Sequence, residues 1–260
     1  MELIENLIPK IPKLDAVPSY DDIMEMRVKS YNSINGKLKG YDCSKCLNKG
    51  YIAKISNGDE VMTECECMKI RSTLDRIKQS GLEKQLKVCT FRNFQTESEW
   101  QQHIKNASVE FVKSDAIGFF IGGQSGCGKT HICTAIIGNF IKQGLSARYF
   151  VWREDSTILK GMINEHEYTD RINEFKKTDV LYIDDLFKQK EIKDADIKLA
   201  FELIDYRLRQ QLKTIISTEL DEDALIECDE ALASRIMQIS RGFRMVIPRD
   251  RNKNYRLRKE

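Results

Sequence analysis

The 260-residue sequence has almost no net charge, few prolines and histidines, and no long hydrophobic run. It contains 42 Lys and Arg against 40 Asp and Glu, a formal net charge of +2, so overall charge does not indicate an acidic or basic partner. No apolar run approaches the roughly 20 residues that cross a bilayer, and the opening Met1-Glu2-Leu3-Ile4-Glu5 lacks the basic stretch of a secretory signal. We therefore expect a cytoplasmic protein with no membrane partner.

The cysteine spacing is not that of a disulfide-stapled domain. Eight cysteines in a cytoplasmic chain of this length stay reduced, so metal ligation or burial has to explain them. Cys43, Cys46, Cys65 and Cys67 form a CxxC and a CxC pair on either side of a predicted hairpin turn at Asn57-Gly58. This pattern predicts a four-thiolate Zn²⁺ site, which would give the segment folding free energy that a small core cannot supply. A redox-active CxxC pair and ordinary burial are the alternatives.

Short β-type runs alternate with helical patterns from residue 111 onward, which predicts a parallel sheet flanked by helices. The five predicted strands are residues 117–121, 147–152, 180–183, 214–217 and 243–247. An amphipathic helix between the third and fourth strands has an apolar face formed by Ile197, Ala200, Phe201, Ile204 and Leu208. The predicted fold class is therefore α/β with a five-stranded parallel sheet.

A phosphate-binding motif follows the first predicted strand. Residues 123–130 read GQSGCGKT, which matches GxxxxGK[ST] in full and precedes a predicted helix from His131 to about Lys142. Glycines let backbone N–H groups point at phosphates, and the helix presents its positive N-terminus to the same anion. We expect Lys129 to neutralise phosphate charge and Thr130 to bind Mg²⁺. The expected ATP-binding residues are Gly123, Gln124, Ser125, Gly126, Cys127, Gly128, Lys129, Thr130, His131 and, from the next motif, Asp184.

The remaining cysteines and the histidines show no ligand spacing. We expect Cys89, Cys127, Cys133 and Cys228 to be ordinary buried or exposed thiols. Cys127 lies beside the expected phosphates, where the helix N-terminus is expected to lower the thiol pKa and favour alkylation. No histidine is assigned a catalytic role.

Paired carboxylates end the third predicted strand, in the sequence VLYIDDL of residues 180–186. This is the form of a Walker B strand, in which Asp184 is expected to hold Mg²⁺ and Asp185 to orient the attacking water. The next strand ends in Thr218 and Glu219, where we expect a nucleotide-sensing group, and Thr218 is counted among the catalytic candidates. Arg235 suits the charge of a γ-phosphate transition state in a neighbouring subunit, although it also fits a solvated helix face.

Together these motifs resemble the DnaC/DnaI-like AAA+ helicase loaders, with the IstB-type transposition ATPases as close relatives. The resemblance covers residues 89 to 256 and rests on TFRNF (90–94), the P-loop, VLYIDDL, TIIST (214–218), LASRI (232–236) and the late Asn254-Tyr255-Arg256. It implies an ASCE-type, Mg²⁺-dependent AAA+ ATPase that self-associates through its ATP site, with Arg235 as the inter-subunit finger. It also implies a DnaB-type helicase hexamer and single-stranded DNA as partners. The family usually has Asn at the position of Glu219 and Gly where this chain reads Leu186-Phe187-Lys188.

Four segments are expected along the chain. These are a partner-docking segment (1–40), a four-cysteine zinc module (41–70), a helical connector (71–88) and the AAA+ ATPase domain (89–260). One short helix is predicted from Asp21 to about Lys37, and the apolar residues 3, 4, 7, 8 and 11 fit either a docking helix or packing on the chain's own core. Only 42 residues follow Thr218, so we expect no C-terminal lid domain and closure over ATP by a neighbour.

The leading functional hypothesis is an ATP-dependent loader of a replicative helicase onto single-stranded DNA during replication initiation. The resemblance implies that residues 153–178 contact single-stranded DNA, and Arg153, Lys160, Tyr168 and Arg171 are suitable residue types for this. The basic segment 241–259 is the other candidate for DNA contact. The alternatives are a transposition helper ATPase acting with a transposase on DNA, a P-loop kinase, and a nucleotide-gated binding protein that scarcely hydrolyses ATP. The zinc module favours the loader, because the resembled IstB group generally lacks it.

Overall fold

The computed structural model describes residues 18–79, 82–188 and 191–257, and its contacts divide the chain into two compact units. Unit 1 covers residues 1–68, and unit 2 covers residues 69–260. The docking helix considered for residues 3–11 lies outside the described residues. Among the helices that are described, none is both long enough and apolar enough to span a bilayer.

The described part of unit 1, residues 18–68, contains one helix and one antiparallel hairpin. Its elements are α1 (Tyr20–Ser33), β1 (Tyr51–Ser56) and β2 (Asp59–Glu64). The hairpin turn is formed by Asn57 and Gly58, whose φ values of 54° and 85° are those of a two-residue type I′ turn. The side chain of Asn32 joins α1 to β1 through hydrogen bonds of 2.9 and 3.1 Å with the backbone of Ala53. The helix and the hairpin predicted from the sequence are confirmed.

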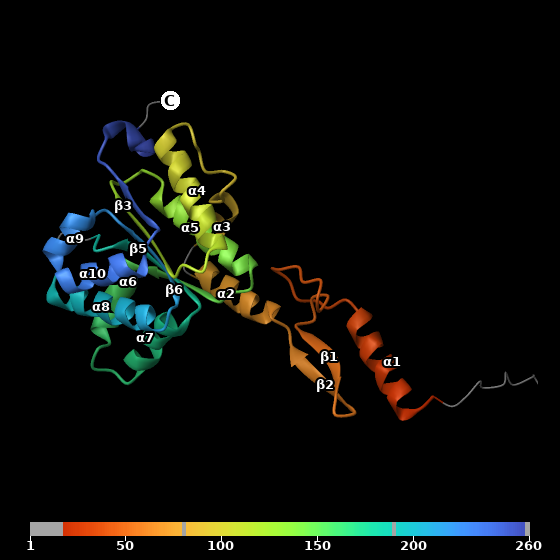
Figure 1. Cartoon of the computed structure of the whole chain (residues 1–260). Helices are drawn as coiled ribbons and strands as arrows, with labels where there is room; N and C mark the ends of the chain where they lie inside the picture. The colour runs from red at the N-terminus through yellow and green to blue at the C-terminus, as the bar shows by residue number, and fades with distance from the viewer. Residues whose placement is uncertain (1–17, 80–81, 189–190, 258–260) are drawn as a thin grey trace, which may run out of the picture. The chain divides into compact units, whose positions relative to one another are not determined.

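Unit 2 is built on a parallel five-stranded sheet in the order β4-β5-β6-β3-β7 (Figure 1). The strands are β3 (Gly118–Gly123), β4 (Ala147–Val151), β5 (Val180–Leu186), β6 (Lys213–Thr218) and β7 (Arg244–Ile247). The register places Phe120 of β3 opposite Ile216 of β6, and Tyr149 of β4 opposite Tyr182 of β5. Because β5, β6 and β3 are adjacent and parallel, the residues that end these strands meet at one edge of the sheet. The predicted parallel sheet is confirmed.

Helices cover both faces of this sheet (Figure 1). They are α2 (Cys67–Gln79, which begins in unit 1), α3 (Glu83–Val88), α4 (Glu99–Lys113), α5 (Lys129–Lys142), α6 (Trp152–Gly161), α7 (Glu167–Lys177), α8 (Asp194–Arg209), α9 (Glu222–Cys228) and α10 (Glu230–Ile239), followed by the 3₁₀ turns η1 (Arg251–Lys253) and η2 (Tyr255–Leu257). On one face, Phe111 of α4 packs on Phe119 of β3 and Phe140 of α5, with ring centroids 5.5 and 5.6 Å apart. On the other face, residues of α6 to α10 share a buried core with Phe120 and Ile183.

Residues 71–88, assigned to a connector in the sequence, form most of α2 and all of α3. Thr73 and Ile77 are buried, and the Thr73 hydroxyl accepts a 3.4 Å hydrogen bond from the backbone N–H of Ala147. The side chain of Leu86 lies against Gly138 of α5. These helices therefore take part in the packing of unit 2.

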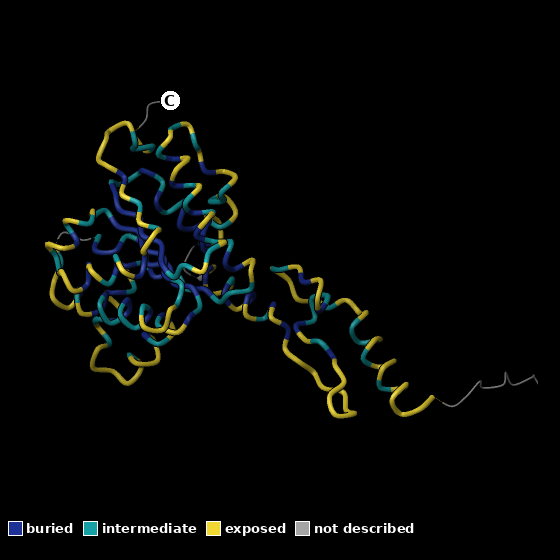
Figure 2. Tube along the Cα trace, in the orientation of Figure 1, coloured by how far each residue is buried: buried dark blue, intermediate teal, exposed yellow. Residues whose placement is uncertain are grey.

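The buried face of α8 differs from the predicted one by a rotation of about one residue. Figure 2 shows that buried segments gather at the centre of unit 2, where the sheet lies. The residues of α8 that are buried are Asp196, Leu199, Ala200, Leu203, Ile204 and Arg207. Ile197, Phe201 and Leu208, which were predicted to be on this face, are only half-buried. The physical reason is that Arg207 points into the protein, where backbone carbonyls accept its hydrogen bonds, and an apolar-periodicity argument does not foresee a buried cation.

Candidate nucleotide-binding site and metal centre

The P-loop connects β3 to α5 and turns tightly because its glycines adopt left-handed φ values. Gly123, Gly126 and Gly128 have φ of 145°, 77° and 93°. A Cβ at Gly126 would lie 2.1 Å from the side-chain oxygen of Asn254, so a larger residue would displace that side chain. The loop leads directly into the first turn of a 14-residue helix, whose free N–H groups form an anion-binding end.

Lys129 is held by the loop itself. Its buried ammonium donates hydrogen bonds of 2.6 and 2.9 Å to the carbonyl oxygens of Gly123 and Gln124. Both acceptors are neutral, so the positive charge stays available for a phosphate bound in the loop. Neutralisation of phosphate charge by Lys129 stays a prediction.

The last described residues of the chain pack on the P-loop. The side chain of Gln124 pairs with the backbone of Asp250 in both directions, at 2.6 and 2.8 Å. The Tyr255 N–H donates to the Gly126 carbonyl at 3.0 Å, and the Arg256 guanidinium lies 3.4 Å from the Ser125 hydroxyl. The late Asn-Tyr-Arg segment therefore supports the conformation of the P-loop. The sequence alone did not indicate this contact.

The TFRNF segment packs on the other end of the P-loop. His131 donates from Nε2 to the carbonyl oxygen of Thr90 at 3.0 Å, and its ring meets the Phe94 ring edge-on at 5.3 Å. Phe94 also lies against Gly128, where a Cβ would come within 3.2 Å of its ring. The interactions of His131 are thus with residues that support the loop.

Cys127 does not have the reactive environment expected from the sequence. Its thiol is buried and donates a 2.9 Å hydrogen bond to the carbonyl oxygen of Gln124. Burial raises the pKa of Cys127, and the nearby Lys129 offsets this only in part. The expectation of a lowered pKa was therefore wrong, because desolvation outweighs the positive helix end.

Asp184 is oriented by three hydroxyl groups. Tyr182 and Ser217 donate to Oδ1 at 2.5 and 2.6 Å, and Tyr149 donates to Oδ2 at 2.6 Å. The Thr130 hydroxyl lies 3.5 Å from Oδ1. Neighbouring oxygen ligands of Mg²⁺, each about 2.1 Å from the ion, are about 3 Å apart, so the Thr130 and Asp184 oxygens fit one magnesium site.

Sequence reasoning missed the three hydroxyls around Asp184. Burial, together with the adjacent carboxylate, raises the pKa of Tyr149 and of Tyr182 well above the usual range, so both remain donors. The sequence offered one signal, which is the position of Ser217 just before the polar end of β6. The pairing of Tyr149 with Tyr182 across β4 and β5 is known only from the structure.

Asp185 lies in a different environment, at the start of a tight turn. Its φ is 55°, and its N–H donates to the Ser217 hydroxyl at 3.0 Å. Its carboxylate pairs with Lys188 at 2.8 Å, and Lys188 also pairs with Glu219 at 3.1 Å. Two positions at which the sequence departs from the resembled family, those of Lys188 and Glu219, are therefore in contact.

Thr218, predicted to be a nucleotide-sensing residue, uses its hydroxyl within the fold. The hydroxyl donates to the carbonyl of Leu186 at 2.8 Å and accepts the N–H of Leu220 at 3.2 Å. From this strand it is Ser217 that contacts Asp184. The sensing role of Thr218 stays a prediction.

Arg235 is on α10 and is partly exposed. Its Nε donates to Asp205 at 2.7 Å, and its guanidinium lies over the Phe201 ring at 4.2 Å. Together with Asp205 and Ser234 it lines a surface hollow of about 380 Å³. Within the described residues, its hydrogen-bond and ring partners are on α8 and α10, so its finger role stays a prediction.

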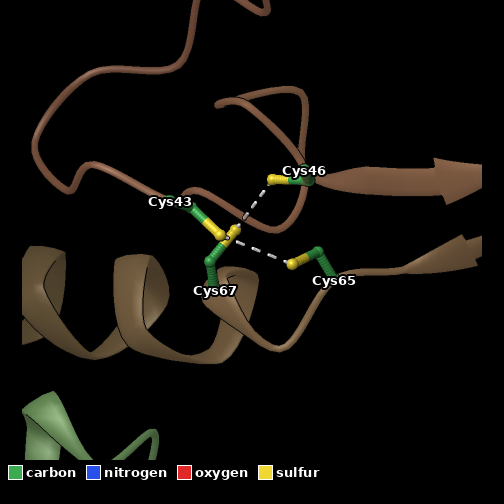
Figure 3. Close-up of side chains that lie close together, drawn as sticks. All are labelled: Cys43, Cys46, Cys65 and Cys67. Atoms are coloured by element: carbon green, nitrogen blue, oxygen red, sulfur yellow. Dashed lines mark hydrogen bonds between the residues drawn. The ribbon is translucent and has the colours of Figure 1, made fainter. Parts of the chain in front are cut away.

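The four N-terminal cysteines form a compact cluster (Figure 3). Their sulfurs lie within 4.8 Å of one another, with 3.7 Å between Cys43 and Cys65 and 3.5 Å between Cys46 and Cys67. A tetrahedral zinc site with Zn–S distances of about 2.3 Å places its sulfurs about 3.8 Å apart. Burial raises the pKa of Cys46, but the Gly50 N–H and the neighbouring thiols lower it to about 6, which favours the thiolate that binds metal. The cluster is compatible with zinc.

Several of the predicted DNA-contacting side chains interact with acidic residues of unit 2. Lys160 pairs with Asp196, Arg171 pairs with Glu174 at 3.4 Å, and the Tyr168 hydroxyl donates to Glu202 at 2.8 Å. In the basic segment 241–259, Arg244 pairs with Glu222 at 3.5 Å. DNA contact by either segment stays a prediction.

Comparisons with known proteins match this chain to one family and to several bacterial proteins. Residues 59–259 match the family described as IstB-like ATP binding protein. The phage-like element PBSX protein XkdC of Bacillus subtilis is 30% identical over 225 residues, which cover 80% of this chain and 82% of that protein. The uncharacterized protein YqaM of the same organism is 32% identical over 76% of this chain and 68% of its own length. The replicative helicase loader DnaI of Bacillus subtilis is 22% identical over 90% of this chain and 88% of its own length.

Solved structures show the same ATPase fold. A crystal structure of DnaI matches 64% of this chain and 91% of its own, with a TM-score of 0.53 and 18% identity. The replication initiator DnaA bound to AMPPCP and single-stranded DNA gives a TM-score of 0.54 at 21% identity, over 64% of this chain but only 51% of DnaA. At these identities the likeness establishes the AAA+ fold and nothing further. The family match and the relatives at 30% identity and above show that this chain belongs to the IstB-like ATP-binding protein family.

Proposed function

We propose that this protein is an ATP-dependent loader that places a replicative helicase on single-stranded DNA. The observation that carries the proposal is the extent of the match to the loader DnaI, which covers 90% of the chain. Unit 2 alone makes up about three-quarters of the residues, so the match includes part of unit 1. The IstB-like family match begins at residue 59 and leaves Cys43 and Cys46 outside.

The chain's own residues account for an ATPase cycle. Lys129 and the N-terminus of α5 would hold the phosphates, and Thr130 and Asp184 would hold Mg²⁺, which when bound neutralises charge on the phosphates. Asp185 would orient the attacking water. Arg235 would act on the nucleotide of a neighbouring subunit, so ATPase activity would require self-association.

Exposed apolar side chains support unit 1 as the helicase-docking part. Between residues 18 and 68, nine large hydrophobic residues remain exposed: Tyr20, Ile23, Met26, Ile34, Leu38, Tyr51, Ile55, Val61 and Met62. Apolar side chains gathered on so small a unit are typical of a protein interface. A zinc site would keep the hairpin that carries four of these side chains in one conformation.

A transposition helper ATPase is the second candidate, and the family description favours it. Such a protein would use the same nucleotide site but would bind a transposase and duplex DNA. The cysteine centre favours the loader instead, because two of its four residues, Cys43 and Cys46, lie outside the family match.

The test is light scattering after size exclusion of this protein mixed with the replicative helicase of its own host or phage, with and without ATP·Mg²⁺. We expect a discrete complex whose formation depends on ATP in the wild type and is lost in Lys129→Ala. If the protein hydrolyses ATP but forms no complex in either state, the loader proposal is wrong, and a transposase becomes the partner to test.

A further inference from the structure

We propose that Lys188 restrains Asp185 until ATP binds, through an ion pair that the γ-phosphate displaces. This inference rests on the proposed ATPase function and concerns the regulation of that same site. Asp185 is the carboxylate expected to orient the attacking water, so a cation that occupies it controls when hydrolysis can occur.

One ammonium bridges two carboxylates at this place. The Nζ of Lys188 is 2.8 Å from Oδ2 of Asp185 and 3.1 Å from Oε1 of Glu219. The backbone N–H of Lys188 also donates to the carbonyl oxygen of Asp185 at 2.9 Å. With Lys188 in this position, the ammonium occupies one acceptor position of Oδ2 of Asp185 and competes for it with an attacking water.

The turn that carries Lys188 is fixed by buried side chains. Asp185 and Phe187 both have left-handed φ values, 55° and 61°, which non-glycine residues rarely adopt. Phe187 is buried, and its ring meets the Trp152 ring edge-on at 5.2 Å. Strained backbone held in place by packing is typical of functional turns. The backbone of Lys188 is therefore anchored, and only its side chain needs to move.

The ion pair is weak enough to be exchanged. The side chains of Lys188, Asp185 and Glu219 are 37%, 27% and 35% exposed. Ion pairs with this exposure change an equilibrium constant by no more than roughly fivefold. Asp185 directly follows Asp184, which contacts Thr130 of the P-loop, so a γ-phosphate would bring several negative charges close to Lys188. Glu219 remains as a second acceptor that keeps the ammonium nearby.

The central test is the ATPase rate of Lys188→Met without a partner protein. We expect kcat to rise about threefold to fivefold, because Asp185 is free from the start, while KM for ATP changes little. Lys188→Arg keeps a cation and is expected to stay near the wild-type rate. The matched control is Lys87→Met, which removes a lysine that pairs with Glu83 at 3.3 Å elsewhere in unit 2 and should leave kcat unchanged.

Glu219 gives a second and independent test. In Glu219→Gln the ammonium has only Asp185 as a carboxylate partner, so we expect kcat to fall about twofold or more. In the double variant with Lys188→Met, the substitution at Glu219 should have no further effect, because it acts through the lysine. A Lys188→Met enzyme slower than the wild type, or an effect of Glu219→Gln that persists without the lysine, would overturn the proposal.

Failure of this inference is distinguishable from failure of the proposed function. If the wild type hydrolyses ATP, Lys129→Ala does not, and Lys188→Met is no faster than the wild type, then the restraint is wrong and the ATPase stands. If neither the wild type nor Lys188→Met hydrolyses ATP, both are wrong. Binding of a fluorescent ATP analogue by each variant shows whether it is folded.

Discussion

Two adjacent aspartates acquire different properties from their neighbours. Asp184 is buried and accepts hydrogen bonds from Tyr149, Tyr182 and Ser217, which fix its orientation toward Thr130. Asp185 is half-buried and faces Lys188. The sequence predicted that both carboxylates are functional. Their surroundings in the structure distinguish them: Asp184 is held rigidly as a candidate metal ligand, whereas Asp185 has an ion-pair partner that can be exchanged.

The environment of Cys127 gives a prediction about chemical reactivity. Its pKa is raised by burial, and only the thiolate is nucleophilic, so iodoacetamide should modify Cys127 several-fold more slowly in the folded protein than in urea at pH 8. In the folded protein the rate should keep increasing as the pH rises past 9, because the raised pKa delays thiolate formation. Mass spectrometry of the alkylated peptides provides the measurement, and faster modification in the folded state at pH 7 would contradict the assignment.

Arg207 gives a prediction about stability. Its buried guanidinium donates hydrogen bonds to the Thr214 hydroxyl and to the backbone carbonyls of Phe175, Lys176, Thr178, Asp179 and Lys213. Arg207→Met would leave several buried carbonyls without donors, so we expect the free energy of unfolding of unit 2 to fall by about 3 kcal/mol.

The comparison for Arg207 is Arg209→Met on the same helix. The Arg209 side chain is 70% exposed, so its loss should change stability by no more than about 0.5 kcal/mol. Scanning calorimetry of both variants measures the difference. Equal melting temperatures of the two variants would show that the hydrogen bonds of Arg207 make no net contribution to the free energy of unfolding.

At the scale of helices and strands, the nucleotide site is formed by residues at the ends of neighbouring strands. The P-loop leaves β3, the paired carboxylates end β5, and Ser217 lies near the end of β6. Because these three strands are adjacent and parallel, their polar ends meet although they are far apart in the sequence. By contrast, α10 places Arg235 against α8, where it lines an open hollow.

The placement of Arg235 predicts that its substitution lowers the ATPase rate only when the protein has self-associated. Arg235→Ala should lower the ATPase rate at high protein concentration at least tenfold, because an arginine finger stabilises transition-state charge, while affinity for ATP stays the same. ATPase rate as a function of protein concentration measures this. Arg209→Ala removes another arginine that pairs with Asp205 and should keep the wild-type profile. A wild-type rate strictly linear in protein concentration would count against the finger.

At the scale of the whole molecule, the two units are stabilised by different means. Unit 2 has an extensive apolar core on both faces of its sheet, whereas the buried cluster of unit 1 consists of four cysteines with Tyr41, Ile52 and Met68 packed around them. α1 has no buried residues. A metal bound by these cysteines would supply folding free energy that so small an apolar core does not provide.

This difference predicts the result of losing the metal centre. Cys46→Ser should abolish the binding of about one zinc per chain and make residues 18–68 sensitive to limited proteolysis, because unit 1 then lacks its main source of stability. Binding of an ATP analogue by unit 2 should remain. Metal analysis and protease mapping provide the measurements, with Cys228→Ser as the control. Full protease resistance of Cys46→Ser would show that unit 1 does not need the metal.

The sequence by itself determined the features that depend on local pattern. The five strands, the Asn57-Gly58 hairpin, the P-loop with Lys129 and the paired carboxylates all follow from spacing, turn chemistry and short-range periodicity. The cysteine spacing likewise predicted a cluster that the structure brings together.

Only the tertiary structure decided which distant groups meet these motifs. The hydroxyl of Tyr149 on Asp184, the bridge from Asp185 through Lys188 to Glu219, and the packing of residues 250–256 on the P-loop join segments far apart in the chain. It also decided that Arg207 is buried and that the pKa of Cys127 is raised. Burial and long-range hydrogen bonding depend on how helices and strands pack together. A local sequence pattern does not specify which distant segment will pack against it.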